Sequence, residues 1–196
     1  MIILGPEQNR EIAKVEPLPK DWTVRCQHKD DRSLIDVMNR FVREHPDLKW
    51  YGYLQDDLKF KTRDWDTRLI AAAGNAGIAS CNDQWRAPKR NTGASVYGGD
   101  LMRAWGFWGP PKLQHTYIDD FWEESGRECN NWTVLMDVIT PHQHFANGKN
   151  KQPMDATYKF SYAPGAQDQA EWYRFRKSKD YADLLARVKS LKTVNA

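Results

Sequence analysis

The chain has 196 residues, of which 40% are hydrophobic and 28% are charged. These values are ordinary for a soluble globular protein of one domain, and no second domain is required. The net charge of +3 permits contact with phosphate-bearing ligands but falls short of a nucleic-acid-binding signature.

The three cysteines, Cys26, Cys81 and Cys129, lack CxxC spacing. They predict neither a disulfide framework nor a cysteine zinc site, and reduced thiols fit a cytoplasmic protein. The first residues contain only a short apolar run before Gly5 and Pro6, so we expect neither a signal peptide nor a transmembrane segment.

The first part of the chain predicts two short strands and a helix. Residues 2–4 and 22–26 are short apolar or β-branched segments; Gly5 and Pro6 follow the first, and a polar cluster that contains Asp30 and Asp31 follows the second. A helix is expected over 33–45, because its first residue is a serine that can cap it and apolar residues recur at helical spacing.

The segment Tyr51 to Leu69 combines an apolar run, an acidic pair and an amphipathic stretch. The run up to Leu54 predicts a strand that ends at Asp56 and Asp57, because carboxylates are costly inside a sheet. The carboxyl ends of strands face the ligand crevice in open α/β sheets, so the pair can hold a divalent cation. Alternatively, these residues only end the strand and cap the next helix.

A helix over 62–73, which places Trp65 in the core, and a strand over 77–81 are expected next. A strand, a helix and a strand in this order predict a right-handed parallel crossover. The basic, proline-containing segment 84–92 predicts an exposed loop, or alternatively a mobile flap over a phosphate ligand.

The segment Ser95 to Pro111 contains Gly98 and Gly99, a helix that starts near Asp100, and a turn rich in tryptophan and glycine. The glycines allow a ligand to approach the backbone closely. Trp108 can either stack on a sugar face or pack in the core.

A second acidic pair, Asp119 and Asp120, lies just ahead of a helix and can meet the first pair only through the tertiary fold. A strand over 132–138 then leads to His142 and His144. Two histidines at positions i and i+2 of an extended segment point the same way, which suits a shared metal or phosphate contact. A surface pair without a role is the alternative.

Residues 145–165 predict a long loop, and 168–191 predict an amphipathic helix or a pair of helices. The segment from Trp172 through Lys192 contains seven basic residues but only two acidic ones. Such a run usually forms a solvated helix face, and the alternative is a patch for an anionic acceptor or a membrane surface.

Four segments in this order resemble the GT-A glycosyltransferases, in particular small proteins similar to family 2. They are LQDDLKFKTRDWDTRL, GGDLMRAWG, HTYIDDFW and PHQHFANGKNKQPMDATY. The resemblance implies an α/β fold: a single GT-A-like (Rossmann-like) domain whose mostly parallel central sheet is flanked by helices. That domain would cover residues 1–165, with a nucleotide-binding half at about 1–83 and an acceptor half at about 84–165. Residues 166–196 would form a C-terminal helical arm packed on it.

The resemblance further implies a metal-dependent, inverting transfer of a sugar from a nucleotide sugar, expected to be a UDP-sugar, to an acceptor hydroxyl. Mn²⁺ or Mg²⁺ would neutralise the pyrophosphate leaving group. Asp57 would be a metal ligand, Asp56 would face the ribose or a metal-bound water, and His142 or His144 would complete the metal shell. Of the two histidines, His142 is nearer to the strand end.

Asp119 or Asp120 would be the catalytic base that removes the proton of the acceptor hydroxyl, and the family pattern favours Asp119. The start of the chain is shorter than in a typical family member. Other residues implied to contact the donor or the acceptor are Asp30, Asp31, Gly98, Gly99, Asp100 and Trp108.

Two other functions fit the same sequence. One is a non-catalytic sugar- or nucleotide-binding module on the same fold, and the other is a nucleic-acid-binding protein that uses basic and aromatic residues. For a transferase, the acceptor stays open between a glycan, a protein, a small molecule and a modified nucleic-acid base.

Overall fold

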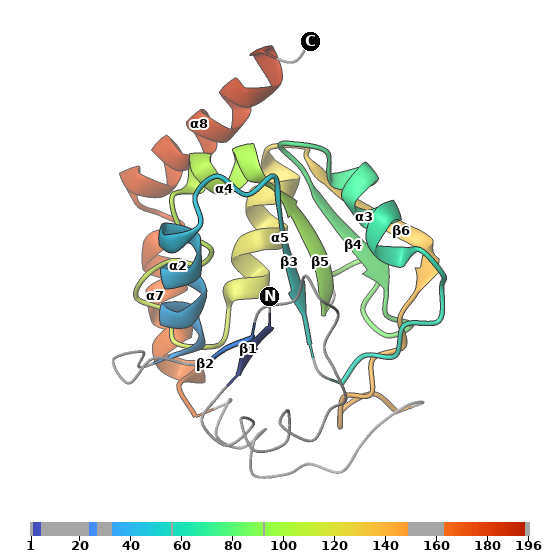
Figure 1. The fold of residues 1–196 in the computed structure, drawn as a ribbon. Coiled ribbons are helices and arrows are strands. Elements are labelled where there is room, and N and C mark those ends of the chain that lie inside the picture. The colour runs from blue at the N-terminus through green and yellow to red at the C-terminus, as the bar shows by residue number, and fades with distance from the viewer. Residues whose placement is uncertain are drawn as a thin grey trace.

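The structure is a computed structural model, and it describes residues 2–4, 24–26, 33–55, 57–91, 93–148 and 163–194. In this part of the chain, a four-stranded sheet lies at the centre and carries helices on both faces (Figure 1). The fold is therefore α/β, as the sequence predicts.

The central sheet has the strand order β3-β5-β4-β6. β5 pairs antiparallel with both β3 and β4, whereas β4 and β6 pair in parallel. Thus β3, β4 and β6 run in one direction and β5 runs against them. The bounds are β3 Trp50–Leu54, β4 Ile78–Asn82, β5 Ala94–Gly98 and β6 Trp132–Ile139.

The first two predicted strands form a separate parallel pair. β1 (Ile2–Leu4) pairs with β2 (Val24–Cys26). Both segments agree with the strands expected from the sequence.

The prediction of a mostly parallel sheet is wrong, because two of the three pairings in the central sheet are antiparallel. The cause is β5, whose sequence ASVYG was not recognised as a strand. All five of its residues are buried, so it lacks the alternation of polar and apolar residues that marks a half-exposed strand. β3 and β4, which precede and follow α3 in the chain, are parallel to each other. They are not neighbours in the sheet, because β5 lies between them.

The helices agree closely with the predicted ones. Ser33 caps α2 by accepting a hydrogen bond from the backbone N–H of Asp36 (3.1 Å), and Gly74 ends α3. The C-terminal segment is a pair of helices. The bounds are α2 Leu34–Glu44, α3 Trp65–Ala73, α4 Gly99–Trp105, α5 Ile118–Glu128, α7 Gly165–Phe175 and α8 Lys179–Val194.

The two faces of the sheet are buried by different helices. Alternate residues of β4 separate the faces: Ile78 belongs to the core cluster that includes residues of α2, α4, α5, α7 and α8, whereas Ala79 belongs to the cluster that includes residues of α3. The larger core contains the tryptophans Trp105, Trp108, Trp122 and Trp172. Trp65 is partly buried against the smaller core and stacks on Phe60.

Two further features concern membranes and thiols. No helix in the described residues is long and apolar enough to cross a membrane. Cys81 and Cys129 are buried, and neither is in a disulfide within the described part of the chain.

Asp168 on α7 holds the loop that leads into α5. Its carboxylate is fully buried and accepts hydrogen bonds from the backbone N–H groups of Gln114 (2.9 Å), His115 (3.0 Å) and Thr116 (2.7 Å). The Thr116 hydroxyl donates a fourth (3.0 Å). Because α5 begins only two residues later, Asp168 fixes the position of its first turn, which carries Asp119 and Asp120.

We expect Asp168→Asn to lower the free energy of unfolding by about 2–4 kcal/mol, because an amide cannot accept at both oxygen positions and turns a donor toward backbone N–H groups. Urea unfolding followed by tryptophan fluorescence measures this. The control is Asp180→Asn, at an exposed position of α8, which should change stability by less than about 0.5 kcal/mol. Equal effects of the two substitutions would contradict the role of Asp168.

Candidate functional site

Three acidic or histidine side chains follow the ends of the three co-directional strands. We call the edge of the sheet at which β3, β4 and β6 end the carboxyl edge. Asp57 follows β3, Asp83 follows β4, and His142 follows β6, each within three residues of the strand end. The direction of the strands therefore brings these residues to one place.

A short backbone pairing places Asp57 beside His142. Leu58 and His142 form an isolated antiparallel bridge, and the N–H of Gln143 donates to the carbonyl oxygen of Asp57 (2.8 Å). The N–H of His142 also donates to the carbonyl oxygen of Asp83 (3.1 Å). Backbone hydrogen bonds thus fix all three residues.

The imidazole of His142 lies between two carboxylates. Its Nε2 is 3.0 Å from Oδ2 of Asp57, and its Nδ1 is 3.8 Å from Oδ2 of Asp83. The side chains of His142 and Asp57 are 3% and 12% exposed, and that of Asp83 is fully buried. Burial alone would lower the pKa of His142, but the contacts with Asp57 and Asp83 raise it above its usual value.

His144 lies beside His142 but in a different environment. Its ring stacks on Trp85 with centroids 4.9 Å apart, and its Nδ1 accepts a hydrogen bond from the N–H of Ala146 (3.1 Å). Burial and the charge of His142 lower the pKa of His144 to about 4, so its ring is neutral at pH 7. Because Nδ1 is an acceptor, the proton of this neutral ring lies on Nε2.

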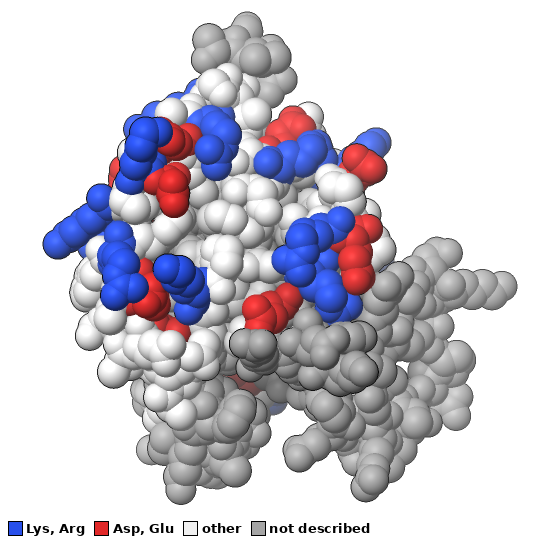
Figure 2. All heavy atoms as spheres, turned by 90° about the vertical axis from the view of Figure 1, so that its left-hand side faces the viewer, with Lys and Arg blue, Asp and Glu red and all other residues white. Residues whose placement is uncertain are grey.

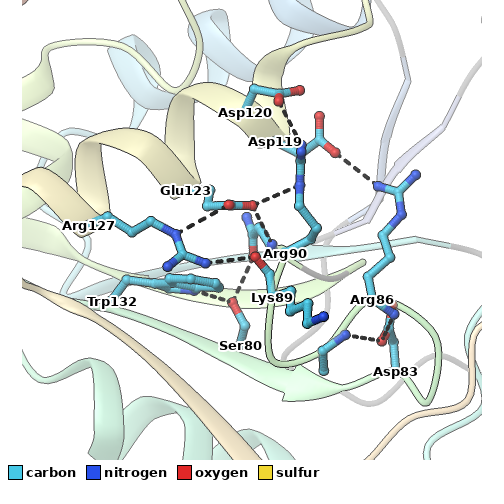
Figure 3. A network of polar contacts seen from close by, with 12 residues as sticks. Ser80, Asp83, Arg86, Lys89, Arg90, Asp119, Asp120, Glu123, Arg127 and Trp132 are labelled. Atoms are coloured by element: carbon cyan, nitrogen blue, oxygen red, sulfur yellow. Dashed lines mark hydrogen bonds and ion pairs between the residues drawn. The ribbon is translucent and has the colours of Figure 1, made fainter.

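The second acidic pair is held by two arginines of the loop that follows β4 (Figure 3). Arg86 donates to Oδ2 of Asp119 (3.0 Å), and Arg90 donates to Oδ1 of Asp120 (2.6 Å). Arg90 also contacts Glu123 (3.1 Å). Both predicted base candidates therefore contact the loop and are only partly exposed to solvent.

Arg86 connects the acidic pair to the carboxyl edge. Its backbone N–H donates to Oδ1 of Asp83 (2.8 Å), while its guanidinium group binds Asp119. Asp119 therefore lies within the reach of one arginine side chain from Asp83 (Figure 3). The described part of this segment, residues 84–91, is a loop with exposed residues, as expected, and the ion pairs of Arg86 and Arg90 tie it to α5.

The two carboxylates of the acidic pair differ in their electrostatics. Burial and the charge of Asp119 raise the pKa of Asp120, and Arg90 offsets part of this increase. A carboxylate with a raised pKa is the better proton acceptor.

Gly98, Gly99 and Asp100 lie at the opposite edge of the sheet, because β5 runs against β3 and pairs Gly98 with Trp50. The structure does not bring them together with Asp57. A Cβ atom at Gly98 or Gly99 would collide with a backbone carbonyl oxygen, of Asn75 or Leu48 respectively. These glycines permit close contact between backbones in the described structure.

The remaining predicted residues fall into two groups. Trp108 is 4% exposed and packs in the aromatic core against Tyr51 and Tyr97, so it does not form a stacking platform at the surface. The other residues, Asp30, Asp31 and Asp56, lie outside the described residues.

The sequence assigned no role to Asp83 or Trp85, and it placed Arg86 and Arg90 only in a basic loop whose alternative role was a flap over a phosphate ligand. The available signal was the position of Asp83 directly after a predicted strand, the same signal that identified Asp57. Nothing in the sequence showed that the basic loop returns to the acidic pair.

The side chains at the carboxyl edge fit a divalent cation that is coordinated partly by the protein and partly by a bound substrate. Asp57 offers a carboxylate and His142 an imidazole, and the second nitrogen of His142 faces a carboxylate, as is usual for a metal-bound histidine. The described residues contain no cluster of three or more potential metal ligands, which argues against a metal site formed by protein side chains alone. Cations that bind substrate phosphates commonly take only one or two protein ligands.

Comparisons of the chain with protein-family models, curated proteins and solved structures found no significant match. The geometry of the carboxyl edge therefore carries the functional proposal.

A double-mutant cycle tests the contact between Asp57 and His142. We expect Asp57→Ala and His142→Ala to show a coupling energy of about 1–3 kcal/mol in urea unfolding with EDTA present, because both partners are largely buried. The control cycle uses Arg68 and Asp137, an ion pair with an exposed carboxylate, whose coupling should stay below about 1 kcal/mol. Additive effects of the Asp57 and His142 changes would contradict the contact.

Proposed function

We propose that the protein is a metal-dependent glycosyltransferase of the GT-A type that moves a sugar from a nucleotide sugar to an acceptor hydroxyl. The observation that carries the proposal is the contact between Asp57 and His142, which are 85 positions apart and meet at the carboxyl edge of the sheet. The sequence resemblance selects these same two residues as metal ligands.

A bound Mn²⁺ or Mg²⁺ would neutralise the charge that develops on the pyrophosphate leaving group. In this proposal, side chains of the protein are the metal ligands. Asp57 supplies an anionic oxygen, and His142 supplies Nε2 from a ring that Asp83 faces on its other side. The remaining coordination positions are then open to the phosphates of the donor.

The acidic pair at the start of α5 supplies the base in this proposal. Inverting transfer requires a carboxylate near the acceptor hydroxyl on the side opposite the leaving nucleotide. The raised pKa of Asp120 supports it as the proton acceptor, while Arg86 holds Asp119 beside it. The family pattern favours Asp119, so both carboxylates are kept as candidates.

The charges on one face of the molecule give little support to nucleic-acid binding at that face. On the face that bears α2 and α7, basic side chains lie next to acidic ones (Figure 2). The ion pairs formed by residues of α2, α7 and α8 or directly after α7 include Arg40–Glu44, Arg174–Glu171, Arg176–Glu124 and Lys179–Asp183. A nucleic-acid-binding surface would instead need a continuous basic patch.

Thermal unfolding with a panel of nucleotide sugars tests the metal site. We expect a UDP-sugar at about 100 times its Kd to raise the Tm by about 5–10 °C when Mn²⁺ is present and to have little effect without it. Asp57→Ala should abolish this shift and the metal-dependent hydrolysis of the donor. The control is Asp66→Ala, an exposed position on α3, which should keep both. A shift of the same size in Asp57→Ala would contradict the proposal.

The pH dependence of transfer tests the base. Arg90 lowers the pKa of Asp120, so Arg90→Gln should raise it. Because the base acts in its deprotonated form, the acidic limb of the kcat/KM profile should move to higher pH. Arg103→Gln, which removes a contact with Asp100 at the far edge of the sheet, should leave the limb in place. An unchanged limb in Arg90→Gln would argue against Asp120 as the base.

A further inference from the structure

The loop that follows β4 places Arg86 between the carboxyl edge and the acidic pair. Oδ1 of Asp83 accepts hydrogen bonds from three consecutive backbone N–H groups, those of Trp85 (3.1 Å), Arg86 (2.8 Å) and Ala87 (2.9 Å). The side chain of Arg86 extends from there to Asp119 (Figure 3). The backbone of Arg86 is therefore fixed near the carboxyl edge, and its guanidinium group lies at the acidic pair.

Trp85 connects this guanidinium group to His142, the proposed metal ligand. The Cζ atom of Arg86 lies 4.5 Å from the centroid of the Trp85 ring. The same ring is nearly perpendicular to the imidazole of His142, with the two centroids 5.3 Å apart. The guanidinium group and the imidazole are thus no farther apart than these two contacts combined. A cation and a diphosphate together can bridge such a separation.

Most of the hydrogen-bonding capacity of Arg86 is unused within the described part of the chain. A guanidinium group has five N–H donors in a planar fork. Nη1 of Arg86 donates to Oδ2 of Asp119 (3.0 Å), which is the one hydrogen bond that this group makes with the described residues. The side chain is 33% exposed, and Figure 3 shows the other terminal nitrogen on the side away from Asp119. Arg86 can therefore bind an anion without releasing Asp119.

An anionic ligand at this position needs a positively charged partner. A diphosphate that reaches Arg86 also approaches the carboxylates of Asp119 and Asp120, whose charges repel it. Arg86 and Arg90 pair with these carboxylates and reduce the repulsion. Guanidinium groups bind phosphate oxygens through parallel N–H···O bonds, as they bind carboxylates. The free donors of Arg86 are thus suited to a phosphate group.

We propose that Arg86 is a ligand of the donor diphosphate, and that its guanidinium group bridges the diphosphate and Asp119. The cation at Asp57 and His142 would hold the diphosphate at one end, and Arg86 would hold it at the other. Asp119 would orient the guanidinium group toward the ligand. The inference rests on the proposed function for the identity of the ligand, a nucleotide sugar. The contact itself can be tested with inorganic diphosphate alone.

Isothermal titration calorimetry of the whole chain with inorganic diphosphate, in the presence of Mg²⁺, tests the contact. We expect Arg86→Gln to weaken the affinity about 10- to 100-fold, because charge-assisted hydrogen bonds to a phosphate are lost.

The matched control is Arg127→Gln. Arg127 also ties the loop to α5, because it donates to the carbonyl oxygen of Lys89 (2.7 Å) and to the carboxylate of Glu123 (3.2 Å). Its substitution should loosen the loop in a comparable way but leave the diphosphate affinity unchanged.

NMR spectra of the arginine side chains locate the contact directly. The guanidinium N–H signals of Arg86 should shift when diphosphate and Mg²⁺ are added to the wild type, and those of Arg127 should not. Signals of Arg86 that stay in place while diphosphate binds would overturn the inference.

The Asp57→Ala variant separates the failure of this inference from the failure of the proposed function. If Arg86→Gln folds and keeps the wild-type affinity while Asp57→Ala loses it, the inference is overturned and the metal-dependent function stands. If Arg86→Gln loses affinity and Asp57→Ala keeps it, the phosphate contact stands and the metal site is contradicted. A wild type that binds no diphosphate contradicts both. Equal losses in Arg86→Gln and Arg127→Gln would show that Arg86 only holds the loop, which also overturns the inference.

Discussion

The shared direction of β3, β4 and β6 is the constraint on which the candidate site depends. Because these strands end at the same edge, residues from three distant parts of the sequence meet there, and β5 fills the gap between β3 and β4 without moving those ends. Backbone hydrogen bonds beyond the strands then bring Asp57, Asp83 and His142 together. The imidazole between two carboxylates is a consequence of sheet topology.

The loop after β4 connects the carboxyl edge to α5 through ion pairs. Asp83 holds the backbone of the loop, and Arg86 and Arg90 reach the acidic pair. Asp168, on the far side of α5, fixes the preceding loop by four hydrogen bonds. The position of the acidic pair is thus set from both sides, which suits residues whose separation from the carboxyl edge must be kept constant.

The sequence predicts the local elements well because their signals are local. The serine cap of α2, the glycine stop of α3 and the apolar run of β6 each depend on neighbouring residues. β5 was not predicted because all five of its residues are buried and it ends in a glycine pair, so it lacks the alternation of polar and apolar residues. The sheet was therefore expected to be mostly parallel. The resemblance to GT-A glycosyltransferases grouped Asp57 with His142, and the two residues are in contact in the structure. The packing role of Gly98 and Gly99, in contrast, depends on which strand lies beside β5. Strand pairing is determined by the tertiary fold, so the local sequence around the glycines does not indicate it.

The central claim is that Asp57 and His142 hold a cation that a nucleotide sugar shares. Crystals grown with Mn²⁺ and UDP, measured at the manganese absorption edge, test it most directly. The account predicts an anomalous peak between the Asp57 carboxylate and Nε2 of His142, with diphosphate oxygens on the same ion. An ion and nucleotide bound elsewhere, with the His142–Asp57 contact still closed, would contradict it.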